Sequence, residues 1–225
     1  MTEEEGILLV DKPAGMTSFS VVHVLRKRLG VKKIGHTGTL DPFATGLLVM
    51  LIGRNYTKRA DEFLQDDKEY LATLRLGIET DSFDSDGKVV ATSDIQPTLA
   101  ELQKAICRFQ GKIEQVPPMF SAKKINGKRL YEMARKGVVV ERKSVLIELT
   151  TTLVRYEYPE VDIHIKCSKG TYIRTIGHEI GKLLGCLAYV SHLRRLRSGK
   201  FSIDKSLSLE KIKDPATDLQ GFLLS

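Results

Sequence analysis

The sequence has few of the residues that build disulfide frameworks or metal sites. Its 225 residues include three cysteines, Cys107, Cys167 and Cys186, at wide spacing and without a C-x-x-C pair. The five histidines show no H-E-x-x-H or H-x-x-x-H spacing. Zinc binding and thiol exchange therefore lack their usual signals, and the cysteine usage indicates a reducing cytosol.

The sequence also lacks a long hydrophobic run. Its most apolar segment, LLVMLI at 47–52, is far shorter than the roughly 20 residues that cross a bilayer. The N-terminal segment MTEEEGILLV opens with acidic residues, and its apolar run is too short for a secretory signal. These features predict a cytoplasmic protein with no membrane-spanning segment.

Motifs for nucleotide cofactors and serine catalysis are missing as well. No G-x-x-x-x-G-K-[ST], G-x-G-x-x-G or G-x-S-x-G occurs. Ser82-x-Asp84-x-Asp86-Gly87 resembles a calcium loop, but Ser93 stands where such a loop has its glutamate. A polar turn between strands is the better interpretation, and no metal or organic cofactor is expected.

Basic residues, in contrast, are in excess. Lysine and arginine number 35 against 28 acidic residues, giving a net charge of +7, while 42% hydrophobic residues are ordinary for a folded soluble protein. The cations gather in RKRLGVKK at 26–33, in RRLRSGK at 194–200, and in a looser set of Lys123, Lys124, Lys128 and Arg129. One such run alone is usually a solvated helix face, but three together favour contacts with the phosphates of a nucleic acid.

Hydrophobic periodicity and turn signals predict one α+β domain. The predicted strands are 6–10, 68–78, 88–92, 138–157, 161–168 and 187–197. The predicted helices start at Thr17 or Ser18 and end at Gly30, follow Asp41-Pro42 as far as Gly53, and cover 58–65, 97–111, 130–135, 171–184 and a short stretch after Ser206. Asn126-Gly127 predicts a tight turn, and a protruding insertion is compatible with this pattern.

The segment GHTGTLDPFATG at 35–46 contains a lone acid, Asp41. Asp followed by proline is a preferred helix start, so an N-cap role explains Asp41 and Pro42 by itself. A cap does not need the glycines of GHTG, which permit close approach of a ligand to the backbone. A helix start would also keep the carboxylate ionised, so capping and catalysis are compatible.

Five segments in one order resemble the TruB family of tRNA pseudouridine-55 synthases. They are LLVDKPAGMTS at 8–18, GHTGTLDPFATGLL at 35–48, KEYLATLRLGIETDSFDSDG at 68–87, FSAKKINGKRLYEMARKG at 120–137 and CSKGTYIRTI at 167–176. The resemblance implies conversion of uridine to pseudouridine in the TΨC loop of tRNA, without metal or organic cofactor. It also implies the pseudouridine synthase fold, a mixed and largely antiparallel central sheet flanked by helices, with an RNA-binding insertion.

The resemblance assigns catalysis to three residues. Asp41 matches the carboxylate that attacks C6 of uracil, attacks C1′ or removes a C2′ proton, and these three routes remain open. Tyr70 matches the tyrosine that stacks on the target base and serves in proton transfer, with a core aromatic on a strand as the alternative. Arg174 matches the arginine that pairs with the catalytic Asp, with a salt bridge on a helix surface as the alternative.

Further positions match substrate-binding residues of the family. His36 matches the histidine that fills the gap left by the flipped base or holds the loop, although an ordinary loop histidine would look alike. Tyr172 and Leu193 match positions that line the uridine pocket, and each of them alone could also be core. Lys12 and Lys123 match backbone or loop contacts.

Many bacterial relatives continue into a C-terminal RNA-binding PUA domain. The expectation here is a single catalytic domain over 1–225 without that domain, and a monomer. A guide-RNA-dependent synthase of the archaeal and eukaryotic branch is the rival within the superfamily, and no guide RNA is expected. A non-catalytic tRNA-folding chaperone is the rival from another class, and the two activities can coexist.

Overall fold

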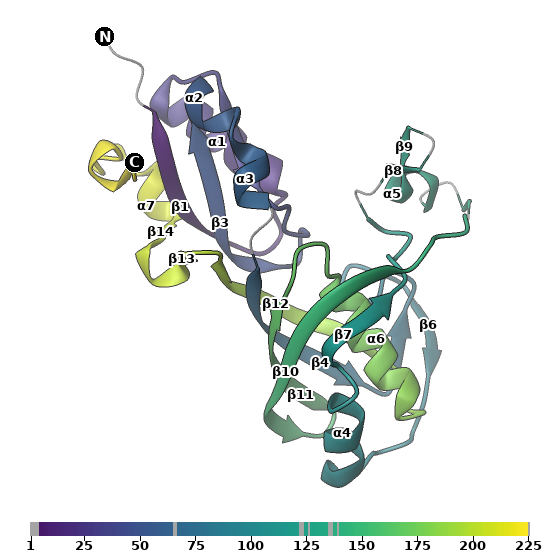
Figure 1. The fold of residues 1–225 in the computed structure, drawn as a ribbon. Coiled ribbons are helices and arrows are strands. Elements are labelled where there is room, and N and C mark those ends of the chain that lie inside the picture. Colours follow the sequence, from purple (N-terminus) through teal and green to yellow (C-terminus); the bar gives the residue numbers. More distant parts are fainter. Residues whose placement is uncertain are drawn as a thin grey trace. The chain divides into compact units, whose positions relative to one another are not determined.

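The computed structural model describes residues 5–64, 67–121, 124–125, 127–134, 137–138 and 140–224. Two compact units are present, one formed by Met1–Leu71 with Leu193–Ser225 and the other by Ala72–His192. Strands β4 (Lys68–Leu76) and β12 (Ala188–Ser198) each begin in one unit and end in the other (Figure 1). The sequence predicts one domain, and the chain crosses between the units at these two strands.

The first unit is built around strand β3, which has a partner on both edges. β1 pairs with it antiparallel along its whole length, while β2 and the end of β12 share its other edge. The strands and helices of this unit, besides the ends of β4 and β12, are β1 (Gly6–Lys12), β2 (Ile34–Thr37), β3 (Thr45–Ile52), β13 (Phe201–Ser202), β14 (Leu207–Ser208), α1 (Ser18–Leu29), α2 (Arg54–Thr57), α3 (Ala60–Leu64) and α7 (Leu209–Lys213). Strand β1 confirms the strand predicted at 6–10.

Both faces of β3 are buried. Leu48, Met50 and Ile52 face a core that includes residues of α1 and α7. Leu47, Val49 and Leu51 face the opposite core, against which Tyr56 of α2 and Phe63 of α3 pack. A strand buried on both faces has a continuous apolar run instead of alternation, and this run cannot be told from a buried helix by period. The predicted helix after Asp41-Pro42 is therefore wrong.

Helix α1 has the ends that the sequence predicts. The Thr17 hydroxyl accepts a hydrogen bond from the Ser20 backbone N–H at 3.0 Å. Gly30 follows the last turn with φ 70° and donates to the Arg26 carbonyl. Because left-handed φ is strained for residues with a Cβ, glycine is favoured at this stop.

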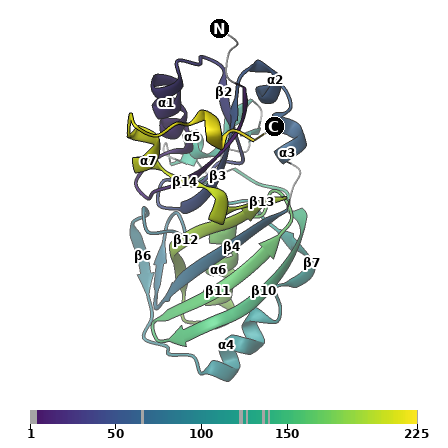
Figure 2. The ribbon, with the colours of Figure 1, turned by 90° about the vertical axis from the view of Figure 1, so that its left-hand side faces the viewer.

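The second unit is a largely antiparallel sheet in the order β12-β4-β11-β10-β7 (Figure 2). Helices and a largely antiparallel sheet occur together in this unit, in agreement with the predicted α+β class. Besides β4 and β12, its strands and helices are β5 (Ile78–Thr80), β6 (Val89–Thr92), β7 (Gln110–Gln115), β8 (Lys124–Ile125), β9 (Lys128–Arg129), β10 (Val145–Glu157), β11 (Glu160–Cys167), α4 (Leu99–Ile106), α5 (Leu130–Ala134) and α6 (Ile173–Leu183).

Strand β7 replaces the end of a predicted helix. The helix predicted over 97–111 begins with a capping box formed by Thr98 and Glu101, and it ends at Ile106. Gly111, interpreted as its C-terminal cap, lies inside β7 opposite Leu149 of β10. Strand pairing with a distant segment therefore overrides the local signal, which a single sequence does not reveal.

Helix α6 packs tightly against the sheet of the second unit. A Cβ at Gly177 would lie 2.8 Å from Leu74 of β4 and from Val190 of β12, too close for a carbon atom. A Cβ at Gly181 would lie 2.3 Å from the Ala188 nitrogen. These two glycines let the helix approach the sheet and fix its position, including the residues of its first turn.

Candidate active site

Asp41 begins a β-turn. The Ala44 backbone N–H donates to the Asp41 carbonyl at 3.1 Å, and Pro42 occupies the second position of the turn. Asp and Pro are favoured at these two positions, so the pair has a local explanation. The predicted N-cap is wrong, since strand β3 follows from Thr45 and no helix begins here. The Asp41 side chain is partly exposed.

Both neighbours of Asp41 are fixed by hydrogen bonds. The buried Ser18 hydroxyl donates to the Leu40 carbonyl at 3.1 Å and accepts from the Leu40 N–H at 2.9 Å. On the other side, the Pro42 carbonyl accepts from the Gly15 N–H at 2.9 Å and from Lys12 Nζ at 3.3 Å. Lys12 is fully buried, and its ammonium also donates to the Met16 carbonyl at 2.7 Å. Lys12 therefore joins the DKPAGM loop to the turn that carries Asp41.

A second buried cation, Arg195, holds the glycine-rich segment that precedes the Asp41 turn. Arg195 is 1% exposed, and its guanidinium donates to the Leu47 carbonyl at 2.7 Å and the Gly38 carbonyl at 3.1 Å. Its backbone passes so close to Gly46 that a Cβ there would lie 2.4 Å from the Arg195 carbonyl oxygen. Gly46 of the GHTGTLDPFATG segment is thus needed for strand packing.

His36 lies in strand β2, opposite Met50 of β3, and is therefore not a loop histidine. Burial lowers the pKa of the His36 imidazole below its ordinary value, and the charge of Arg195 lowers the pKa further. Its Nδ1 atom is buried without a hydrogen-bond partner among the described residues. His36 is therefore kept neutral, and its imidazole retains hydrogen-bonding capacity.

Two more of the predicted pocket residues belong to the first unit. Tyr70 lies on β4 and is 9% exposed, and Leu193 lies on β12 and is 7% exposed. The Leu193 carbonyl accepts a hydrogen bond from the Thr45 hydroxyl at 3.4 Å. This bond links Leu193 to the first residue of the strand that follows the Asp41 turn.

In the second unit, Arg174 is buried at the start of α6 and is 4% exposed. Its Nη1 lies 3.2 Å from the Asp84 Oδ2 atom and donates to the Ser82 carbonyl at 2.9 Å. Its Nη2 donates to the Phe120 carbonyl at 2.6 Å. Arg174 is thus a buried ion-paired cation. The alternative interpretation also expected a salt bridge, but this one is buried and does not lie on a helix surface.

Asp84 is held in turn by the polar turn between β5 and β6. The Ser82 hydroxyl donates to its Oδ1 atom, and the Asp86 N–H donates to the same oxygen at 3.1 Å. The Thr80 hydroxyl donates to the Asp84 carbonyl at 2.8 Å. The segment interpreted as a plain polar turn therefore presents a buried carboxylate to Arg174.

The backbone of Tyr172 is fixed by a side-chain amide. Gln115 of β7 accepts a hydrogen bond from the Tyr172 N–H at 2.8 Å and donates to the Tyr172 carbonyl at 3.1 Å. Gln115 is 3% exposed, and Tyr172 is the residue that precedes α6. This pair of bonds fixes the chain two residues before Arg174.

The structure thus groups the predicted site residues by unit. Asp41, His36, Lys12, Tyr70 and Leu193 belong to the first, while Arg174 and Tyr172 belong to the second. Lys123 lies outside the described residues.

Three buried polar residues that hold these positions or the GHTGTLDPFATG segment are not predicted from the sequence: Arg195, Asp84 and Gln115. Arg195 lies in a run that predicts surface charge, and Asp84 lies in a segment that predicts a plain turn. Burial of a single charged residue has no local signal in a sequence.

The basic clusters are partly used inside the protein. Arg28 donates to the Asp214, Pro215 and Thr217 carbonyls at 3.2, 3.0 and 2.7 Å. Arg194 forms a two-bond ion pair with Asp11, at 2.7 and 3.1 Å. The lysines at 27, 32 and 33 are exposed. The lysines of the first cluster are therefore more exposed than its arginines, Arg26 and Arg28, which are partly buried.

Among the residues that the structure describes, no group of three or more His, Cys, Asp or Glu side chains is arranged to hold a metal ion. In the same part of the chain, no helix is long and apolar enough to span a membrane.

Comparison with known proteins decides the family. Residues 26–173 match the TruB family pseudouridylate synthase (N terminal domain), and residues 174–223 match the tRNA pseudouridylate synthase B C-terminal domain. The chain belongs to the TruB family of pseudouridylate synthases. Membership confirms the resemblance seen in the five sequence segments and makes the chain an isomerase.

Several relatives are similar over nearly the whole chain. A tRNA pseudouridine synthase B of Protochlamydia amoebophila is 60% identical over 204 residues, which cover 91% of this chain and 78% of the relative. A protein of the same name from Chlamydia abortus is 55% identical over 220 residues, covering 98% of this chain and 94% of the relative.

Solved structures agree on the fold. The chain is similar to one in the crystal structure of a Cbf5-Nop10-Gar1 complex, with TM-score 0.73 and 28% identity over 92% of this chain and 53% of that one. It also resembles one in an H/ACA RNP bound to a substrate RNA containing 2′-deoxyuridine, with TM-score 0.70, 26% identity and coverage of 93% and 52%. This chain thus spans about half the length of these two structural relatives, and the predicted α+β pseudouridine synthase fold is confirmed.

Proposed function

We propose that this chain converts uridine-55 in the TΨC loop of tRNA to pseudouridine, with Asp41 as the catalytic carboxylate. The observation that carries the proposal is the Asp41 turn: a partly exposed carboxylate in a backbone fixed on both sides, in a chain 60% identical to a tRNA pseudouridine synthase B. A fixed backbone with an accessible side chain is what a group needs when it acts on a bound nucleotide.

The reaction breaks the bond between C1′ and N1 of uracil and forms a bond between C1′ and C5. The C5 proton leaves to solvent, and N1 acquires a proton, so atoms and charges balance without a co-reactant. A stacked and paired base cannot turn in this way, so the nucleotide has to be flipped out, at a cost of roughly a few kcal/mol. Asp41 then attacks C6, attacks C1′ or removes a C2′ proton, three routes that share the same carboxylate.

The other predicted residues receive roles in the same proposal. Tyr70 stacks on the target base and assists proton transfer. Arg174 contributes the positive charge of its guanidinium to the reaction. His36, Tyr172 and Leu193 line the substrate site. Lys12 holds the Asp41 turn through its bond to the Pro42 carbonyl. Lys123 contacts RNA, and an RNA-binding insertion contributes to tRNA binding.

We further propose that the chain works as a monomeric, cytoplasmic, single catalytic domain over 1–225, without guide RNA or cofactor. Incubation with a tRNA transcript alone tests the absence of guide RNA and cofactor, because a requirement for either would leave the transcript unmodified.

The experiment uses tRNA transcript labelled with tritium at uridine C5. The proposal predicts tritium release from the normal transcript and none above background from a transcript in which uridine-55 alone is replaced by cytidine and unlabelled there. Equal release from both would contradict the position, and tRNA binding without release would favour the chaperone function.

A further inference from the structure

The turn that holds Arg174 contains an unusual backbone conformation. Phe83 has φ 63°, in the left-handed region that residues with a bulky side chain rarely adopt. The Phe83 N–H donates to the Thr80 carbonyl at 3.2 Å, and its carbonyl accepts from the Val190 N–H at 3.0 Å. A strained residue at this position persists only when surrounding contacts hold it.

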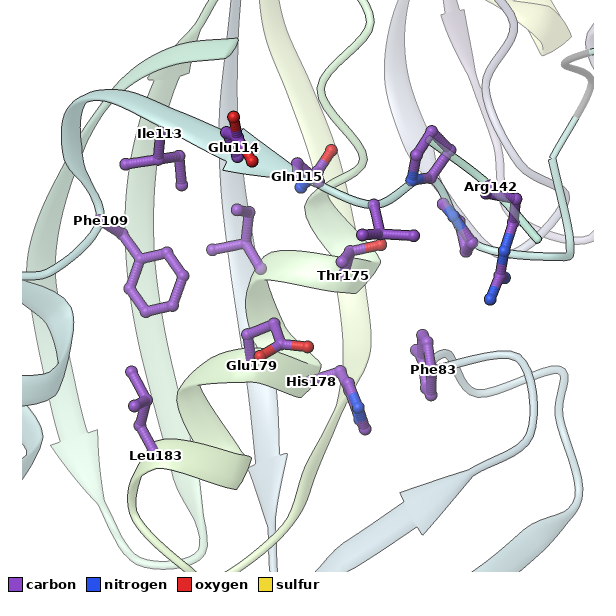
Figure 3. A pocket seen from close by; sticks show the side chains of 14 residues that line it. Phe83, Phe109, Ile113, Glu114, Gln115, Arg142, Thr175, His178, Glu179 and Leu183 are labelled. Atoms are coloured by element: carbon purple, nitrogen blue, oxygen red, sulfur yellow. The ribbon is translucent and has the colours of Figure 1, made fainter. Parts of the chain in front are cut away.

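One contact comes from the helix that carries Arg174. The Phe83 ring stacks on the His178 imidazole, with the ring centres 3.9 Å apart and the planes 15° apart (Figure 3). His178 lies four residues after Arg174 on α6, so both side chains project from the same side of the helix. The His178 Nδ1 atom also lies 3.8 Å from Glu79 Oε1, on the strand before the turn.

The residues on both sides of Phe83 bind Arg174. The Ser82 carbonyl accepts from its Nη1 atom at 2.9 Å, and the Asp84 carboxylate lies 3.2 Å from the same atom. The strained residue is therefore the central one of three, and a rotation of its backbone would move both acceptors away from the guanidinium. Within the second unit, the Ser82-Phe83-Asp84 turn thus contacts two side chains of α6, those of Arg174 and His178.

We propose that His178 is a positioning residue for the isomerase reaction. Its stack on Phe83 keeps the turn in the conformation that presents the Ser82 carbonyl and the Asp84 carboxylate to Arg174. The inference rests on the proposed function in one respect, that Arg174 takes part in the reaction. His178 acts through Phe83 and needs no contact with RNA.

Simple packing is the competing explanation. Phe83 and His178 also line a cavity of about 410 Å³ beside α6, together with Thr175 and Glu179 (Figure 3). If the ring of Phe83 only fills space, smaller side chains should be progressively worse, because they leave progressively larger cavities. If the ring holds a strained backbone, glycine should be better than alanine, because glycine adopts a left-handed φ at little cost.

The first test compares Phe83→Ala with Phe83→Gly in single-turnover tritium release from tRNA. We expect Phe83→Ala to lower the rate constant about tenfold, as for loss of an aromatic pair, with tRNA affinity unchanged. Phe83→Gly should retain a higher rate than Phe83→Ala. The opposite order, with glycine slower than alanine, would overturn the proposal in favour of packing.

The second test replaces the partner ring. His178→Ala should lower the rate constant about tenfold with tRNA affinity unchanged, and His178→Phe should restore it, because an aromatic ring again covers Phe83. Glu179→Ala, on the same helix and in the same cavity, is the matched control with a rate like the wild type. Failure of His178→Phe to rescue a soluble, folded variant would overturn the proposal.

A double-mutant cycle tests whether Phe83 and His178 act together. In the Phe83→Gly background, His178→Ala should have little further effect, because its partner ring is gone. Full additivity of the two effects would contradict a shared role. If the wild-type chain itself released no tritium, the proposed function would fail, whereas an active wild type with an equally active His178→Ala variant would overturn this inference alone.

Discussion

Asp41 and Arg174 are held in opposite ways. Asp41 has a partly exposed side chain on a backbone fixed through Leu40 and Pro42. Arg174 is 4% exposed, and its guanidinium itself is bound by Asp84, Ser82 and Phe120. In the first case the protein fixes the chain and leaves the acid accessible; in the second it buries the charge and fixes its head group.

This difference has a physical reason. An acid that acts on a bound nucleotide has to reach it, so its backbone is fixed in advance while its side chain keeps some exposure. A buried cation, by contrast, needs compensation, because moving a charge out of water is expensive unless an opposite charge and hydrogen bonds replace the water. Changes to the two regions should therefore have different consequences.

The largest expected effect on stability comes from the second unit. Asp84→Ala removes the carboxylate that pairs with buried Arg174, and breaking a buried pair typically costs about 3–5 kcal/mol of unfolding free energy. Asp86→Ala, in the same turn but exposed, is the control and should change stability little. Urea unfolding of both variants measures the difference, and equal stability would contradict the importance of the pair.

A smaller loss is expected where the backbone is fixed in the first unit. Ser18→Ala leaves both the N–H and the carbonyl of buried Leu40 without the Ser18 hydroxyl, which corresponds to about 1–3 kcal/mol. Loosening the Asp41 turn should also slow tritium release. Ser20→Ala is the control, because the Ser20 hydroxyl forms a hydrogen bond only with the Thr17 hydroxyl among the residues that the structure describes. A Ser18→Ala enzyme with unchanged stability and rate would show that the turn needs no anchor.

The pH dependence of stability should report on His36. Its pKa is lower in the folded protein than in the unfolded chain, mainly because of burial, so the unfolded chain binds more protons on acidification. The stability contribution is present at neutral pH and declines as the pH falls below the unfolded pKa of about 6.5. Comparing the Tm at pH 7.5 and 5.5, we expect a larger fall in wild type than in His36→Gln. Parallel curves would contradict a buried neutral His36.

The smallest effect concerns the exposed lysines. Lys32→Ala should weaken tRNA binding modestly and lower the slope of log affinity against log salt by about 1. Lys213→Ala provides a lysine control on α7, outside the predicted clusters. An unchanged slope in Lys32→Ala would exclude this lysine from the phosphate contacts.

The sequence predicts those parts of the fold whose signals are local. Helix α1 follows from Thr17, Gly30 and the spacing of its apolar residues. Strand β3 does not, because its burial on both faces depends on segments far away in the chain. Strand β7 is missed for a related reason: its partner β10 comes much later in the chain.

The candidate site divides in the same way. Asp41 stands out because a family pattern surrounds it, although the local rule assigns it to a helix that does not exist. Asp84 and Gln115 have no local signal, since their importance comes from contacts with Arg174 and the Tyr172 backbone. A buried polar partner is recognised only after the chain has been folded around it.

In the proposed reaction, Asp41 supplies the catalytic carboxylate from a turn whose backbone is already fixed. The most direct test is single-turnover tritium release by Asp41→Asn, with tRNA affinity and Tm measured on the same preparation. We expect a rate at least about a thousandfold lower, as for loss of a principal catalytic group, with affinity and Tm close to wild type. A variant that binds tRNA normally and still releases tritium at the wild-type rate would contradict it.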